Sequence, residues 1–272
     1  MNEDQLPDGW SDGAGGYDEW FAGFTGLYAD AVLDRLGVGA GTTVVDVAAG
    51  TGATSLRAAQ RGAAVTAVDF AAGMVDTVSL GFARGGHTSC VARQMDGQSL
   101  DLPDGGFDVG LSMFGLMFFP DPSLGLAELT RVTRQGGTIA IATWDLGSYP
   151  LHRLIAGALE VAVPGIGHAP RPAPTWAPLG TPEGLQELLE RGGLRDVRVE
   201  VVSHRWHFED PAGFLRSMPS WSSPVRPLFE ALPPECIDDA AAAFAELVAA
   251  EGGTMGGEGI AMSALVATGT VT

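Results

Sequence analysis

The feature that most constrains the fold is an alternation, between residues 42 and 143, of short β-rich runs with stretches of helical spacing. Two of the runs, Val44–Val47 and Thr138–Ala142, consist almost entirely of small and apolar residues. Such runs are typical of parallel strands covered on both faces. The alternation therefore predicts a doubly wound α/β sheet with helices on both faces. The expected strands are Thr42–Val47, Ala63–Asp69, Thr88–Met95, Phe107–Met113 and Thr138–Thr143.

The segments that flank this region follow other patterns. Residues 1–16 are rich in Gly, Asp and Pro without periodicity, so we expect a loose arm, or a loop that orders when a ligand binds. Residues 17–36 carry apolar side chains at three- and four-residue steps, which predicts one or two amphipathic helices. Six prolines between positions 150 and 178 surround a short helical stretch and indicate an inserted lid. Beyond it we expect a helix from Thr181 to Gly192, a strand at Val197–Val202, a helix at Pro234–Ala250 and a strand at Ile260–Thr268.

The charge balance narrows the function. All 15 basic residues are Arg, against 33 acidic residues, and the net charge is −18. The absence of Lys excludes chemistry that needs an ε-amine, such as a Schiff base or a P-loop lysine. A strongly acidic surface repels phosphate backbones and anionic lipid heads, so neither nucleic acid nor a membrane is an expected partner. A small neutral or cationic substrate is favoured.

The remaining bulk properties indicate an ordinary cytoplasmic protein. Cys90 and Cys236 are too few for a disulfide framework and have no metal-site spacing. The first residues lack the basic-then-apolar order of a signal peptide. We expect a cytoplasmic monomer or homodimer without a metal.

The segment from Val44 to Thr54 places a strand directly before a glycine-containing turn and a helix. Gly50 and Gly52 allow backbone amides and the next helix N-terminus to face a polar ligand. The pattern alone is also compatible with a tight turn that binds nothing. Asp69 ends the second expected strand, where it suits ribose hydroxyls, although it is equally placed to cap the following helix. Asp96, Met113 and Trp144 end the next three strands, so these side chains converge on one edge of the sheet.

Five different short motifs follow one another along the chain at a characteristic spacing. They are Asp46-Val47-Ala48-Ala49-Gly50-Thr51-Gly52, Ala67-Val68-Asp69-Phe70 with Met74, Met95-Asp96-Gly97 before Leu102-Pro103, Gly106-Phe107-Asp108-Val109 and Arg134-Gln135-Gly136-Gly137-Thr138. In combination they resemble the class I S-adenosylmethionine-dependent methyltransferases, in particular the small-molecule branch with the ubiquinone/menaquinone-type (type 11) enzymes. The resemblance covers residues 17–144, with weaker similarity at 181–198.

The resemblance implies a Rossmann-like, seven-stranded sheet whose last strand is antiparallel, and S-adenosyl-L-methionine as cofactor. It implies that Asp46, Ala48, Gly50 and Gly52 surround the methionine moiety, that Asp69 holds the ribose, that Phe70 and Met74 flank the adenine, and that Asp96 and Gly97 read its edge. Tyr17 and Met113 are further expected contacts. Ala48 departs from the pattern because many members have Gly there, and its methyl group is tolerable if its φ is negative.

On this basis we divide the chain into four parts. These are an N-terminal arm and helical cap (1–36), a cofactor-binding core (37–145), a lid or substrate insertion (146–181), and a C-terminal part of the core sheet with a helical insertion (182–272). The expected reaction is methyl transfer to O, N or C of a small, largely apolar metabolite, in specialised metabolism. Methionine and aromatic side chains such as Phe118 and Trp176 are candidates to line the acceptor pocket.

Three alternatives remain at this stage. A protein with this pocket can catalyse a cyclisation or rearrangement without methyl transfer, or bind ligands without catalysis, because the fold does not fix the reaction. A nicotinamide-dependent oxidoreductase fits less well, since Ser55 stands at the third glycine position and no Tyr–Lys pair exists without Lys. If the reaction needs a general base, His152 in the lid is our candidate, ahead of His168 and His207.

Overall fold

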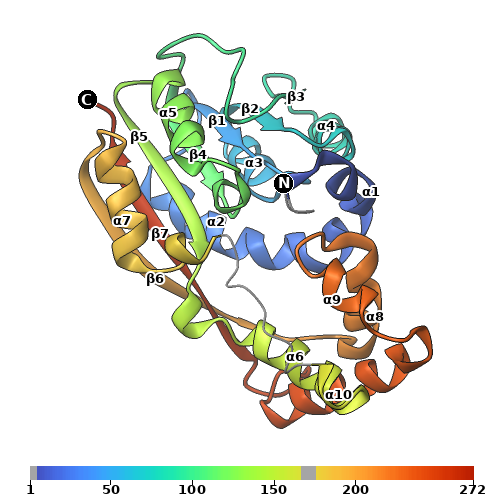
Figure 1. Ribbon diagram of the computed structural model, residues 1–272. Helices are drawn as coiled ribbons and strands as arrows, with labels where there is room; N and C mark the ends of the chain where they lie inside the picture. The colour runs from blue at the N-terminus through green and yellow to red at the C-terminus, as the bar shows by residue number, and fades with distance from the viewer. Residues whose placement is uncertain (1–4, 167–175) are drawn as a thin grey trace.

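The computed structural model describes residues 5–166 and 176–272. Its seven-stranded sheet has the order β3-β2-β1-β4-β5-β7-β6 (Figure 1). The strands β1 to β5 pair in parallel, whereas β7 runs antiparallel to both β5 and β6. This confirms the Rossmann-like sheet with an antiparallel last strand. The strands are β1 (Thr43–Val47), β2 (Ala64–Asp69), β3 (Val91–Gln94), β4 (Phe107–Met113), β5 (Thr133–Trp144), β6 (Arg195–Trp206) and β7 (Ile260–Thr270).

Helices cover both faces of the sheet, as predicted. Leu126 and Leu129 of α5 pack with Leu185 and Leu189 of α7 against one face. The other face packs against α2, α3 and α4 in a second hydrophobic cluster. These helices are α2 (Gly23–Arg35), α3 (Ala53–Gln60), α4 (Ala72–Arg84), α5 (Pro122–Val132) and α7 (Pro182–Arg191).

A group of helices lies beside the carboxyl ends of the parallel strands (Figure 1). It comprises α6 (Pro150–Ala162), α8 (Pro211–Trp221), α9 (Arg226–Glu230) and α10 (Ile237–Ala250). The helical stretch expected within the lid is therefore confirmed as α6, and α10 packs against both α6 and α8. The four-part division of the chain stays a prediction. Within the described ranges, no helix is long and apolar enough to cross a membrane.

The segment expected to be a loose arm is instead largely helical. Residues Pro7–Tyr17 form α1, which begins with Pro at its first position and buries Gly13 and Ala14. Four glycines weaken its intrinsic helix propensity and hide the apolar pattern. Tertiary contacts with α4 on one side and α8 on the other compensate for this weakness (Figure 1).

Candidate active site

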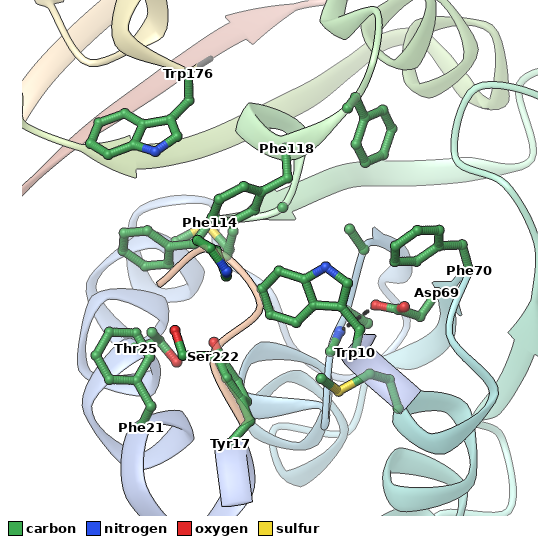
Figure 2. A pocket seen from close by; sticks show the side chains of 18 of the residues that line it. Trp10, Tyr17, Phe21, Thr25, Asp69, Phe70, Phe114, Phe118, Trp176 and Ser222 are labelled. Carbon is green, nitrogen blue, oxygen red and sulfur yellow. Dashed lines mark hydrogen bonds between the residues drawn. The ribbon is translucent and has the colours of Figure 1, made fainter. Parts of the chain in front are cut away.

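A cavity of about 390 Å³ opens at the carboxyl ends of β1, β2, β4 and β5. This edge is where open α/β sheets bind their ligands. Residues of α1, α2 and α6, together with Trp221 and Ser222, line its other sides. Figure 2 shows Trp10 of α1, Thr25 of α2 and Ser222 around this space. The cavity therefore lies between the sheet and the helical group.

The turn after β1 shapes the floor of the cavity. Gly50 has a φ of 57° and donates its N–H to Asp69 Oδ2 at 2.8 Å. Gly52 has a φ of 95° and is the N-cap of α3. A Cβ atom at Gly52 would lie 2.5 Å from Val78 Cγ2, which explains the need for glycine. Gly50 lines the cavity, whereas Gly52 is outside the lining and serves the packing of α3 on α4.

Two residues without the freedom of glycine adopt left-handed backbone conformations at the cavity. Ala48 has a φ of 57° and Phe114 has a φ of 65°. The sequence analysis expected a negative φ at Ala48, and the structure shows that this expectation is wrong. The loop after β1 turns sharply where it packs against the loop after β4. A Cβ atom at Gly115 would lie 2.3 Å from Ala48 Cβ. Strain of this kind concentrates at functional sites.

The Asp69 carboxylate joins the turn after β1 to the segment that leads into α4, because each of its oxygens accepts a backbone N–H. Oδ2 accepts the Gly50 N–H at 2.8 Å, and Oδ1 accepts the Ala71 N–H at 3.0 Å, just before α4. Burial raises the pKa of Asp69 to about 6. Each carboxylate oxygen has a second lone pair, and Asp69 lines the cavity, so it retains capacity for hydroxyl donors.

Asp46 is the more deeply buried carboxylate, with 1% of its surface exposed. Ser55 Oγ donates to its Oδ2 at 2.6 Å, while its Oδ1 is buried without a hydrogen-bond partner. Burial raises the pKa of Asp46 to about 7. A buried, unpartnered acceptor is costly and indicates a missing donor or cation.

The other candidate contacts for the cofactor surround the same space. Met74 and Gly97 are buried, Phe70 and Met113 are half-buried, and Asp96 is exposed and accepts the Gln98 N–H at 2.8 Å. Tyr17 lies against Gly50, and burial raises the pKa of its hydroxyl to about 12. Of the twelve predicted site residues, all but Gly52 line the cavity: Tyr17, Asp46, Ala48, Gly50, Asp69, Phe70, Met74, Asp96, Gly97, Met113 and His152.

His152 of α6 lines the opposite end of the cavity. His152 is exposed at the residue level, and its ring lies beside those of Tyr149 and Trp176, with centroids 4.8 and 6.0 Å away. Desolvation beside these rings lowers the pKa of His152, so its ring is neutral at pH 7. His207 is outside the cavity lining, near the Gly257 carbonyl at 3.2 Å. His168 lies outside the described residues.

Sequence reasoning predicted Tyr17 of α1 but missed Trp10 of the same helix and the residues at the end of α8. Trp10 of α1 lies between Phe118 and Tyr17, close to Asp69 (Figure 2). Trp221 and Ser222, at the end of α8, also line the cavity. A possible signal was the spacing of Trp10 and Tyr17, which puts both on one helical face, but the intervening glycines obscured it.

Comparison with known proteins agrees with this geometry. Residues 45–141 match the family described as "Methyltransferase domain". A demethylmenaquinone methyltransferase of Beutenbergia cavernae is 39% identical over 123 residues, which are 45% of this chain and 49% of that protein. The chain spans about half the length of the curated relatives it matches.

Solved structures share the fold over most of the chain. A putative methyltransferase from an antibiotic biosynthesis pathway of Anabaena variabilis superposes with a TM-score of 0.59, 17% identity and coverage of 89% of this chain and 96% of that one. The cyclase SpnF gives 0.52, 19% identity and coverage of 90% and 80%. The chain therefore has the fold of these structures, and its residues 45–141 match a methyltransferase domain, as the motifs predicted. The curated relatives of this core include enzymes of the menaquinone type.

Proposed function

We propose that the protein transfers a methyl group from S-adenosylmethionine to O, N or C of a small, largely apolar acceptor, in specialised metabolism. The observation that carries the proposal is the convergence of Asp46, Asp69 and Asp96 on one cavity at the edge of the sheet. No other charged side chain lines the cavity within residues 5–166 and 176–272. A ligand with an ammonium and a sulfonium suits such a site.

The residues present fit this cofactor. Asp46 Oδ1, buried and unpartnered, suits the ammonium of the methionine moiety. Asp69 suits the ribose hydroxyls, and Phe70 and Met74 offer apolar surface to the adenine. When bound, S-adenosylmethionine supplies the electrophilic methyl group.

The main role of the protein's own residues is to position the acceptor relative to the cofactor. Methyl transfer needs an acceptor atom held in line, about 3–3.5 Å from the methyl carbon, in a space without water. Trp10 and Tyr17 of α1, together with Trp221, line the cavity with aromatic surface, which disfavours water beside the reacting atoms. His152, neutral and beside the apolar end, is placed to take a proton from the acceptor.

Titration calorimetry with S-adenosylmethionine tests the proposal. Asp69→Ala should weaken binding by about 1–3 kcal/mol, since the carboxylate loses its hydroxyl partners. Asp101→Asn, an exposed carboxylate outside the cavity, is the matched control. Unchanged affinity in a folded Asp69→Ala variant would contradict the assignment. Product formation without release of S-adenosylhomocysteine would indicate cyclisation or rearrangement instead.

A further inference from the structure

The strand β6 forms one edge of the sheet, and within the described ranges it pairs only with β7 (Figure 1). Its register with β7 is unbroken from Arg198 to Trp206, and a bulge interrupts it only at the start of the strand, where Asp196 has a φ of 53°. No backbone hydrogen bond joins β6 to any other described segment. The outer edge of β6 therefore presents a long row of unpaired N–H and C=O groups.

One face of β6 carries valines. Val197 and Val199 pack against the hydrophobic cluster that includes Leu185 and Leu189 of α7. Val201 is the next residue on this face, because side chains alternate along a strand, and 57% of its surface is exposed. A long, regular edge with an exposed apolar side chain near its centre is a template for pairing with another strand.

The other face of β6 carries two opposite charges, one residue to either side of Val199. Glu200 pairs with Arg35 of α2 at 2.5 Å, whereas Arg198 is exposed and forms no ion pair with the described residues. The whole strand contains three Arg and two acidic residues, so its charge is +1 in a chain of net charge −18. The local charge of this edge therefore does not oppose the approach of a second acidic chain.

We propose that two copies of the chain pair antiparallel along β6, with the two-fold axis of the dimer beside Val199. Such an axis is perpendicular to the sheet, so residues equally distant from Val199 in the two copies lie opposite each other. Arg198 of each copy then opposes Glu200 of the other copy. On the second face, Val197 of each copy opposes Val201 of the other. Opposite charges and β-branched side chains stabilise a sheet when they face each other in this way.

Neighbouring registers lack this complementarity. An axis beside Arg198 or Glu200 would bring identical charges directly opposite each other, which is destabilising. An axis beside Val201 would place Val197 opposite Arg205. The order of side chains on β6 therefore favours the register centred on Val199.

The dimer leaves each cavity complete within one copy. Strand β6 runs in the same direction as β5, since both are antiparallel to β7. Antiparallel pairing of the two β6 strands therefore joins the two sheets into one and directs the two cavities towards opposite edges of it. The inference is independent of the proposed function, and breaking the dimer should leave cofactor binding unchanged.

Sedimentation velocity of the full chain, from about 1 to about 100 µM, tests the dimer. We expect the wild type to pass from monomer to dimer in this range. Val201→Lys should raise the dissociation constant roughly tenfold or more, because it places an ammonium beside Val197 of the other copy. Val161→Lys is the matched control, since Val161 of α6 is 66% exposed and lies away from β6. Calorimetry with S-adenosylmethionine should give wild-type affinity in both variants, as neither residue lines the cavity.

Charge reversal tests the predicted contacts across the interface. Arg198→Glu brings two carboxylates together on each side of the axis and should weaken the dimer roughly tenfold. Adding Glu200→Arg to this variant restores opposite charges in both places, so the dissociation constant should return most of the way to the wild-type value. Loss of the Arg35–Glu200 pair cannot produce such a recovery, because that pair lies within one copy.

Engineered cysteines test the register. In Val199→Cys the two introduced residues face each other, with Cα atoms about 4.5–5.5 Å apart, and should form a disulfide between copies under mild oxidation. In Val201→Cys they are displaced by four residues, about 13 Å along the strand, and should not. Random collisions would instead favour position 201, which is the more exposed. The wild type gives the background from Cys90 and Cys236.

Three results would each overturn the proposal. They are a wild type that stays monomeric up to about 100 µM, a Val201→Lys dimer as tight as the wild type, and cross-linking at position 201 that is as fast as at position 199. Absence of recovery in the double charge reversal would also overturn it.

Discussion

Replacing Asp46 with Asn should change how the stability of the ligand-free protein depends on pH. Burial raises the pKa of Asp46 from 3.8 to about 7, so the folded state holds a proton that the unfolded state has released between these values. The free energy of unfolding therefore falls as pH rises through this window. Between pH 5 and pH 8 the loss from Asp46 is about 2–3 kcal/mol, taking 1.36 kcal/mol per pKa unit.

Asp46→Asn removes this titration and keeps an oxygen that can accept the Ser55 hydroxyl, now 2.6 Å from Oδ2. Urea unfolding at pH 5 and at pH 8 gives the free energy of unfolding at each pH. Its decrease from pH 5 to pH 8 should be about 2–3 kcal/mol smaller in the variant than in the wild type. A smaller pH dependence remains because the pKa of Asp69 is also raised, to about 6. Identical losses in the two proteins would refute the reasoning.

The cofactor supplies a second readout of the same group. A cation beside Asp46 Oδ1 stabilises its ionised form, so binding releases a proton below pH 7. The affinity for S-adenosylmethionine should then rise from pH 5 to pH 8, and this rise should be smaller in Asp46→Asn. Affinity that is independent of pH in the wild type would place the ammonium elsewhere.

Three further substitutions test other features of the site. Ala48→Gly relieves the left-handed strain at a φ of 57°, so the free energy of unfolding should stay unchanged or rise by up to about 1 kcal/mol. A lower unfolding temperature in the variant would show instead that the methyl group contributes packing. Gly52→Ala should cost about 2 kcal/mol or more, since its Cβ meets Val78 at a φ of 95°, and an unchanged urea midpoint would contradict this. Trp10→Phe should reduce the change in tryptophan fluorescence on S-adenosylmethionine addition; an unaltered change would place Trp10 away from the ligand.

The core could be predicted from the sequence because its signals are local. The apolar run before Asp46 and the glycines after it mark a strand, a turn and a helix within a few residues. Since the strands are parallel, their ends had to meet, and Asp46, Asp69 and Asp96 do line one cavity. The backbone of Ala48 was not predictable, because its φ is imposed by the neighbouring loop at Gly115.

The helical cover of the site could not be predicted in the same way. Helix α1 lacks a continuous apolar face, and α8 contains Pro219 within its span. Both are stabilised by contacts between segments far apart in the sequence, such as the packing of Gly13 on the Trp221 backbone. The site residues that were missed, Trp10 and Trp221, belong to these two helices.

Besides the rings of Trp10 and Tyr17, helix α1 contacts α4 and α8 through closely packed backbone. The Gly73 N–H of α4 donates to Ser11 Oγ at 3.3 Å, and Gly13 and Gly16 leave no room for a methyl group beside Trp221. Contacts this close cannot slide by small amounts. A side chain added at Gly13 or Gly16 would therefore shift α1 as a whole and move the Trp10 and Tyr17 rings away from the cavity that they line.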